Sequence, residues 1–106
     1  MPSITRAAAH QTVITTFDVS PGTCHDLLDL LHDAYDAFIR LQPGFIGAAL
    51  HVNDAQTRIA NYSQWKQRED FLAMLRSAEM RRRNREMAAL CKTFEPVMYE
   101  VTETFG

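Results

Sequence analysis

The sequence predicts an α+β domain in which helices pack on one face of a single antiparallel sheet. Four segments have the character of strands, and two of them, Gln11–Val19 and Arg58–Trp65, alternate with a period of two. The segments that follow the first and third of these strands carry apolar residues at helical spacing. The chain of 106 residues has the length of one domain. Residues 11–106 are predicted to form that domain, and residues 1–10 a flexible N-terminal leader.

The first strand and the first helix are expected within residues 11–40. The strand runs from Gln11 to Val19, with Val13, Thr15 and Phe17 on one face. Thr23 and Asp26 resemble a capping box, so the helix is predicted to begin at Thr23 and to continue to Arg40. Its apolar face comprises Cys24, Leu27, Leu28, Leu31, Ala34, Tyr35 and Phe38.

The second and third strands are predicted over Phe45–Val52 and Arg58–Trp65. On the third strand, Asn61, Ser63 and Trp65 share one face with Ile59. If Asn53–Gln56 is the whole loop between the strands, Asn61 lies opposite Ala48, Ile59 opposite Leu50, and Trp65 opposite Gly44. Small residues would then leave space beside the amide and the indole, where a ligand fits.

The opposite face of these strands is half apolar. It is expected to carry Phe45, Gly47, Ala49 and His51 beside Ala60, Tyr62 and Gln64. A bare, half-apolar sheet face in so short a chain predicts contact with a second subunit, so a homodimer is expected.

The last third of the chain completes the pattern. Helices are predicted over Lys66–Ser77 and Glu79–Cys91, with a break near Ser77, and a final strand over Phe94–Phe105. On that strand Val97, Tyr99, Val101 and Phe105 share a face. The order of elements is the ferredoxin-like βαββαβ pattern.

Composition and spacing exclude several classes of function. The formal net charge of −2 gives no basic surface for nucleic acid, and no apolar run reaches membrane-spanning length. The four histidines are scattered, so no metal site is expected. Cys24 and Cys91 are isolated and favour a reduced, cytoplasmic protein. The run Arg81–Arg85 is interpreted as helix charge balanced by Glu79 and Glu86, with Arg81 or Arg85 at a pocket mouth as the alternative.

Two motifs and one aromatic residue carry a resemblance to a known family. They are Pro43-Gly44-Phe45, Asn61-Tyr62-Ser63-Gln64-Trp65 and Phe71. Over roughly residues 11–101 the chain resembles the antibiotic biosynthesis monooxygenase family, in particular its small stand-alone, quinone-forming members from aromatic polyketide pathways. The resemblance implies a homodimer of the dimeric α/β barrel type, with a pocket between sheet and helices in each subunit. It also implies oxidation of a phenolic or anthrone-type ring with O2, without flavin, haem or metal.

The resemblance also implies which residues do the chemistry. Asn61 and Trp65 are the catalytic candidates, and Arg85 matches a helix-borne arginine. Thr15 stands where several relatives carry asparagine, and Phe71 where some carry tyrosine. The expected substrate-binding residues are therefore Thr15, Ala48, Leu50, Phe71 and Arg85. Leu75 lies where the haem-degrading branch keeps its histidine ligand, so haem degradation is not expected.

Three functions remain open at this point. The first is a cofactor-independent monooxygenase that converts a polycyclic aromatic polyketide into a quinone. The second is a polyketide cyclase on the same dimeric fold, which consumes no O2. The third is a non-catalytic binding dimer in which Asn61 and Trp65 only contact a ligand.

Overall fold

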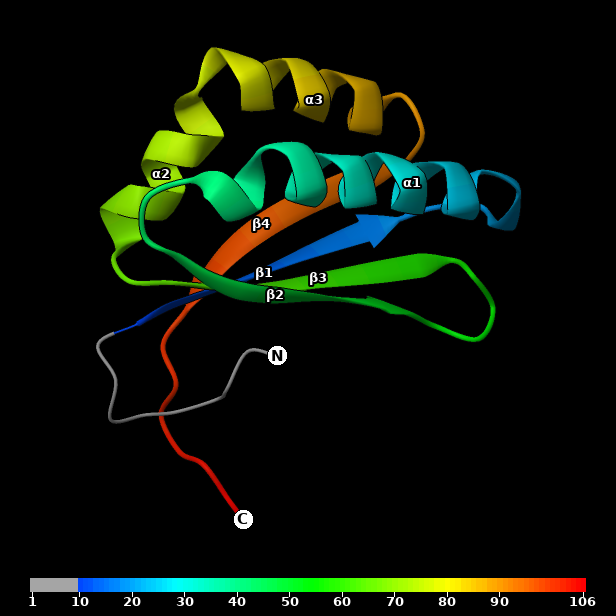
Figure 1. The fold of residues 1–106 in the computed structure, drawn as a ribbon. Coiled ribbons are helices and arrows are strands. Elements are labelled where there is room, and N and C mark those ends of the chain that lie inside the picture. Colours follow the sequence, from blue (N-terminus) through cyan, green and yellow to red (C-terminus); the bar gives the residue numbers. More distant parts are fainter. Residues whose placement is uncertain (1–9) are drawn as a thin grey trace.

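The computed structural model describes residues 10–106, which form one four-stranded antiparallel sheet with helices on one face (Figure 1). The expected leader lies outside the described residues except for its last position, His10. The sheet order is β2-β3-β1-β4, as the ferredoxin-like pattern requires. The elements are β1 (Gln11–Asp18), α1 (Pro21–Ala37), the short 3₁₀ helix η1 (Ile39–Leu41), β2 (Phe45–Val52), β3 (Arg58–Trp65), α2 (Arg68–Arg76), α3 (Ala78–Ala88) and β4 (Thr93–Tyr99).

Helix α1 begins earlier than predicted. Its N-cap is Ser20 and its first residue is Pro21, so the predicted start at Thr23 is wrong. Proline suits this position because its fixed φ is helical and its missing N–H has no partner there anyway. The helix also ends before Arg40, at Ala37, and η1 follows. The predicted apolar face is confirmed by the burial of Cys24, Leu27, Leu31 and Ala34.

The register of the β2–β3 hairpin differs from the predicted one by two residues. Val52 pairs with Ile59, Leu50 with Asn61, and Ala48 with Ser63. The loop is longer than four residues because the Asn53 side chain closes it. Asn53 Oδ1 accepts hydrogen bonds from the backbone N–H groups of Thr57 and Arg58, each at 2.9 Å. A shift of two residues preserves the faces, so the predicted faces of β3 are confirmed.

A β-bulge at the start of β2 moves Phe45 to the helix side of the sheet. Phe45 pairs with Trp65 while Gly47 pairs with Gln64, so Ile46 is the extra residue. The prediction that Phe45 lies on the open face is therefore wrong. Its ring meets the Trp65 indole edge-to-face, with 5.3 Å between the centroids. Gly44 precedes it with φ +82°, a conformation that favours glycine.

The last helices and strand are shorter than predicted. The break at Ser77 is confirmed, because Ser77 caps α3 by accepting a hydrogen bond from the Met80 N–H at 3.2 Å. Strand β4 ends at Tyr99, so the prediction of a strand to Phe105 is wrong. None of the described helices has the length and apolarity needed to cross a membrane.

The core lies between the sheet and the helices. Residues from β1, α1, β3, α2 and α3 contribute to it, and Trp65 and Ile59 are among its completely buried members. This layer is where the strand face with Asn61 meets α1 and α3, so it is also the layer that holds the candidate site.

Candidate functional site

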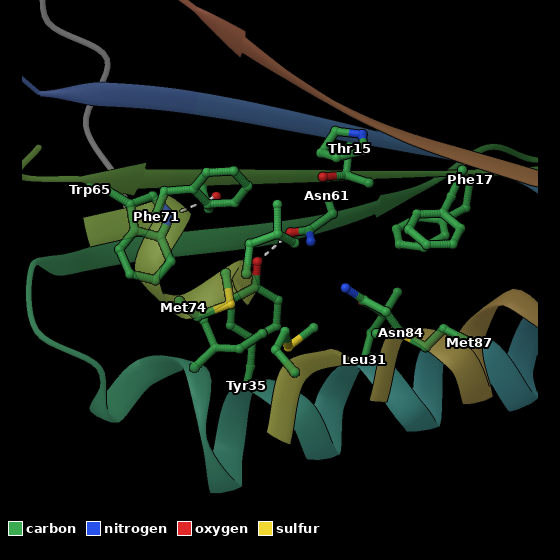
Figure 2. A pocket seen from close by; sticks show the side chains of 16 residues that line it. Thr15, Phe17, Leu31, Tyr35, Asn61, Trp65, Phe71, Met74, Asn84 and Met87 are labelled. Carbon is green, nitrogen blue, oxygen red and sulfur yellow. Dashed lines mark hydrogen bonds between the residues drawn. The ribbon is translucent and has the colours of Figure 1, made fainter. Parts of the chain in front are cut away.

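A small cavity lies between the sheet and the helices (Figure 2). Its volume of about 40 Å³ is room for roughly two or three water molecules. Most of its wall is aromatic or aliphatic, with Met74, Met80 and Met87 on the helix side. None of the described residues that line it carries a charge. The polar members of the wall are Thr15, Tyr35, Asn61, Ser63 and Asn84.

Asn61 stands at the centre of the cavity wall. Strand pairing places it between Thr15 on β1 and Leu50 on β2. Its Oδ1 accepts a hydrogen bond from the Tyr35 hydroxyl on α1, with 2.6 Å between the oxygens. Figure 2 shows the amide nitrogen turned toward the cavity, facing Asn84 of α3. The amide therefore presents N–H donors to whatever occupies the cavity.

Trp65 closes one end of the cavity and is completely buried. Its indole Nε1 donates a hydrogen bond to Ser63 Oγ at 3.2 Å. The rings of Phe45 and Phe71 meet it edge-on, with centroids 5.3 and 5.9 Å away. Because an indole has a single donor, the Trp65 N–H is already engaged within the protein.

Tyr35 is the ionisable side chain in the described wall. Burial raises its pKa to about 12, and the hydrogen bonds of the phenol with Asn61 and Ser63 oppose that rise. The phenol is consequently protonated at neutral pH. It acts there as a hydrogen-bond donor and not as a base.

The structure brings four of the seven predicted site residues to this cavity: Thr15, Asn61, Trp65 and Phe71. Ala48 and Leu50 line a neighbouring groove of about 300 Å³, together with His32, Arg40 and Phe45. Tyr35 borders both spaces. Arg85 is exposed and lines neither of them.

Sequence reasoning missed Tyr35, Ser63 and Asn84. Tyr35 was assigned to the apolar face of α1, and its hydroxyl partner lies on another element. Ser63 shares the strand face of Asn61 and Trp65, which was a usable signal. Asn84 lies four residues after Met80 and three before Met87, so helical spacing places it on their buried face despite the surrounding arginines.

The described residues contain no cluster of three or more histidine, cysteine, aspartate or glutamate side chains that could hold a metal ion. The arginine run also behaves largely as expected. Arg82 pairs with Glu79 at 2.8 Å and with Glu86 at 2.9 Å, and Arg83 pairs with Glu79 at 2.8 Å. These ion pairs confirm the interpretation of helix charge balanced by two glutamates.

Comparison with known proteins gives a consistent result. The model of the family described as "Antibiotic biosynthesis monooxygenase" matches residues 11–86. Tetracenomycin-F1 monooxygenase from Streptomyces glaucescens is 30% identical over 95 residues, which are 90% of this chain and 84% of that protein.

Solved structures share the fold. SnoaB from Streptomyces nogalater, described as a cofactor-independent oxygenase, superposes with a TM-score of 0.81 at 21% identity, covering 92% of this chain and 97% of the other. The ActVA-Orf6 monooxygenase of Streptomyces coelicolor, solved with nanaomycin D, gives a TM-score of 0.74 at 22% identity, covering 92% and 91%. At these identities the likeness shows the fold, and the ferredoxin-like prediction is confirmed.

Proposed function

The chain belongs to the antibiotic biosynthesis monooxygenase family, and from that premise we propose that it is a cofactor-independent monooxygenase. Its proposed substrate is a phenolic or anthrone-type ring of a polycyclic aromatic polyketide, which O2 oxidises to a quinone. The observation that carries the proposal is an uncharged, largely apolar cavity with the amide of Asn61 aimed into it. SnoaB, which shares the fold, is described as a cofactor-independent oxygenase.

The proposed reaction needs no cofactor because the substrate supplies the electrons. The reacting CH2 carbon of an anthrone loses a proton, and the resulting enolate transfers an electron to O2. The two radicals combine to form a C–O bond and, after protonation, a hydroperoxide. Loss of water, which breaks the O–O bond and the remaining C–H bond, leaves the quinone carbonyl.

The protein's part in this scheme is to hold charge and limit water. Asn61 N–H groups would stabilise the enolate oxygen and then the peroxide oxygen. Thr15 and Phe71 would flank the ring, and the Trp65 indole would form the end wall. The described wall has no carboxylate, imidazole or amine, so the first proton goes to water or to an ionised phenolate of the substrate itself. An apolar surrounding protects the hydroperoxide from side reactions.

A polycyclic ring needs more space than the cavity offers. Ligand sites generally span about 300–1,000 Å³, against the 40 Å³ found here. Methionine side chains are flexible, and Met74, Met80 and Met87 form much of the helix-side wall, so their repacking is the proposed way to open it. The groove beside Ala48 and Leu50 is the proposed place for the part of the substrate that does not react.

We also propose that the protein acts as a homodimer in the cytoplasm. Strand pairing builds a row of outward side chains across the open sheet face, Ala49–Tyr62–Ile14–Val97, flanked by polar rows that contain Thr16, His51 and Glu95 or Thr12 and Gln64. An apolar centre with a polar rim is the usual anatomy of a subunit interface. The two free cysteines, one buried and one half-buried, suit a reducing compartment.

Oxygen uptake with dithranol, a hydroxylated anthrone, tests the proposed function. Protein that has been dialysed against a chelator and freed of flavin is expected to consume O2 and to form the quinone. Asn61→Ala is expected to slow turnover by roughly 10²-fold, as for the loss of an oxyanion donor, with little change in KM. Ring closure of a poly-β-ketone without O2 uptake would indicate the cyclase instead, and tight binding without either reaction would indicate a binding protein.

A further inference from the structure

Asn84 places an amide on the buried face of helix α3. It lies four residues after Met80 and three before Met87, both of which are buried, and all three side chains line the small cavity. The arginines on either side of it, Arg83 and Arg85, do not line the cavity. Helix α3 therefore presents an amide to the cavity between two methionines.

The Asn84 amide has no hydrogen-bond partner among the described residues. The Thr15 hydroxyl, on the sheet side of the same cavity, has none among them either. Asparagine also has a low helix propensity, because its side chain competes for backbone hydrogen bonds. An unpaired amide in the middle of a helix therefore lowers stability, and such a residue is expected where function requires it.

Asn61 faces Asn84 from the sheet side of the cavity. Its Oδ1 accepts the hydrogen bond from the Tyr35 hydroxyl at 2.6 Å, so its N–H groups remain for a ligand. In Figure 2 the Asn84 side chain extends from α3 toward Asn61, and both amide nitrogens point into the space between them. No hydrogen bond joins the two amides within the described part of the chain. Because two N–H donors cannot bond to each other, an acceptor atom between them is what satisfies both.

A ligand oxygen fits this place by size and by polarity. The cavity of about 40 Å³ is too small for an aromatic ring but large enough for a carbonyl or enolate oxygen. Most of its wall is apolar, and a hydrogen bond in such surroundings is stronger than one in water. An ammonium or amine group would meet the N–H groups of Asn61 there, so the wall selects an acceptor.

We propose that Asn84 is a substrate-binding residue that, together with Asn61, holds one acceptor oxygen of the ligand between the sheet and the helices. The oxygen is that of a ring carbonyl or of the corresponding enolate. A strand and a helix then bind the same atom, so the spacing of the two layers becomes part of the recognition. The identity of the ligand as an aromatic polyketide rests on the proposed function, but the recognition of an acceptor oxygen does not.

Asn84→Leu tests the proposal, because it keeps the size of the side chain and removes its hydrogen-bonding groups. The probes are 1,8-dihydroxyanthraquinone and 1,8-dihydroxyanthracene, which differ in the two ring carbonyls. Quenching of Trp65, the only tryptophan in the chain, measures their binding. Asn84→Leu is expected to weaken binding of the anthraquinone about 10-fold, the worth of one buried hydrogen bond, and that of the anthracene less than about twofold. Arg81→Leu, at an exposed position of α3, is the matched control and is expected to bind both probes as the parent does.

Stability separates ligand binding from a structural role. Because the amide is unpaired within a helix, Asn84→Leu is expected to raise the Tm of the free protein by about 2 to 4 °C. A lower Tm would mean that the amide stabilises the fold, and would overturn the proposal. Equal weakening of both probes would also overturn it, since Asn84 would then maintain the shape of the cavity and not bind a carbonyl.

Oxygen uptake keeps the inference distinct from the proposed function. With dithranol as substrate, kcat/KM of Asn84→Leu is expected to fall about 10-fold. If the parent consumes no O2 but Asn84→Leu loses anthraquinone binding selectively, the oxygenase proposal fails and the carbonyl recognition stands. If the parent consumes O2 and Asn84→Leu binds the anthraquinone as tightly as the parent, the oxygenase proposal stands and the role of Asn84 is overturned.

Discussion

The two faces of strand β3 carry similar residue types, but their polar side chains have different kinds of hydrogen-bond partner. The helix side carries Asn61, Ser63 and Trp65, and the open side carries Ala60, Tyr62 and Gln64. On the helix side, Asn61 bonds to Tyr35, which is 26 residues away on α1. On the open side, Gln64 Nε2 donates to the Tyr62 hydroxyl, only two residues away, at 3.1 Å.

This difference shows that the element packed on a strand face determines which hydrogen bonds its polar side chains form. Under the helices, the amide and the hydroxyls are held by distant elements and aimed into a cavity. On the open side, the Gln64 amide bonds to Tyr62 on the same face, next to the apolar row of Ala49, Tyr62 and Ile14. The first arrangement suits a small ligand, and the second suits another flat surface.

The largest expected effect comes from placing a charge on the open face. Ala60→Glu puts a carboxylate in the row directly beside the apolar centre of the proposed dimer interface, twice in a two-fold symmetric dimer. A buried, unpaired charge is expected to raise the dimer dissociation constant on the order of 10³-fold, or about 4 kcal/mol. Sedimentation velocity at several concentrations measures this shift.

The matched control for this change is Ala55→Glu, in the exposed β2–β3 loop, which is expected to leave association unchanged. Asn61→Ala on the helix side is expected to leave it unchanged as well. A parent protein that sediments as a monomer at micromolar concentration would contradict the dimer, and with it the role of the open face.

The next largest effect is expected at Gly44, in the turn that precedes Phe45. Gly44→Ala places a methyl group against the Asp70 carboxylate, at a φ of +82°. Backbone strain together with this collision is expected to lower the free energy of unfolding by about 3 to 4 kcal/mol. Urea denaturation measures the change, and Gly22→Ala, where an added Cβ meets nothing within 4 Å, is the matched control. Equal stability of the two variants would show that the Gly44 turn relaxes easily.

The sequence predicted the fold well because the fold depends on patterns within short segments. The flanking turns located β2 and alternation located β3 at their observed ends, and helical spacing identified the buried face of α1. Hairpin register was not accessible in this way, because it depends on how Asn53 folds back on Thr57 and Arg58 and on Gln56 adopting φ +56°. One bulged residue, Ile46, was then enough to move Phe45 to the other face.

The site was predicted only in part, for a related physical reason. Asn61 and Trp65 could be placed on one face because a strand has a fixed period. Tyr35 could not be joined to them, because its role depends on how closely α1 packs over β3. An apolar helix face with a tyrosine in it looks the same whether the hydroxyl reaches a partner or solvent.

The third prediction concerns the ionisation of Tyr35, whose phenol is buried on the helix side in the folded protein and exposed to water in the unfolded chain. Its folded-state pKa of about 12 lies above the ordinary value of 10.0, so the folded protein holds the phenol proton more tightly than the unfolded chain. The resulting stabilisation is fully present below pH 10 and is lost as the pH rises through 12. The parent is expected to lose about 2 to 3 kcal/mol of unfolding free energy over this range beyond what Tyr35→Phe loses. Parallel slopes for the two proteins would show that the phenol is not buried as described.

The smallest expected effect distinguishes two neighbours on α3. Asn84 lines the cavity opposite Asn61, whereas Arg85 is exposed and lies in the last turn of the helix. Asn84→Ala is expected to reduce kcat/KM about 10-fold through the loss of one hydrogen bond to a bound ligand. Arg85→Ala is expected to change kcat/KM less than twofold and to lower stability by a few tenths of a kcal/mol, because a cation there favours the helix dipole. Arg81→Ala, also exposed on α3, is the surface control. A tenfold loss of kcat/KM in Arg85→Ala, absent in Arg81→Ala, would mean that α3 turns its arginine toward the substrate when the methionine wall opens. The helix side of the sheet would then be a site completed by its ligand, and its contrast with the open face would be sharper still.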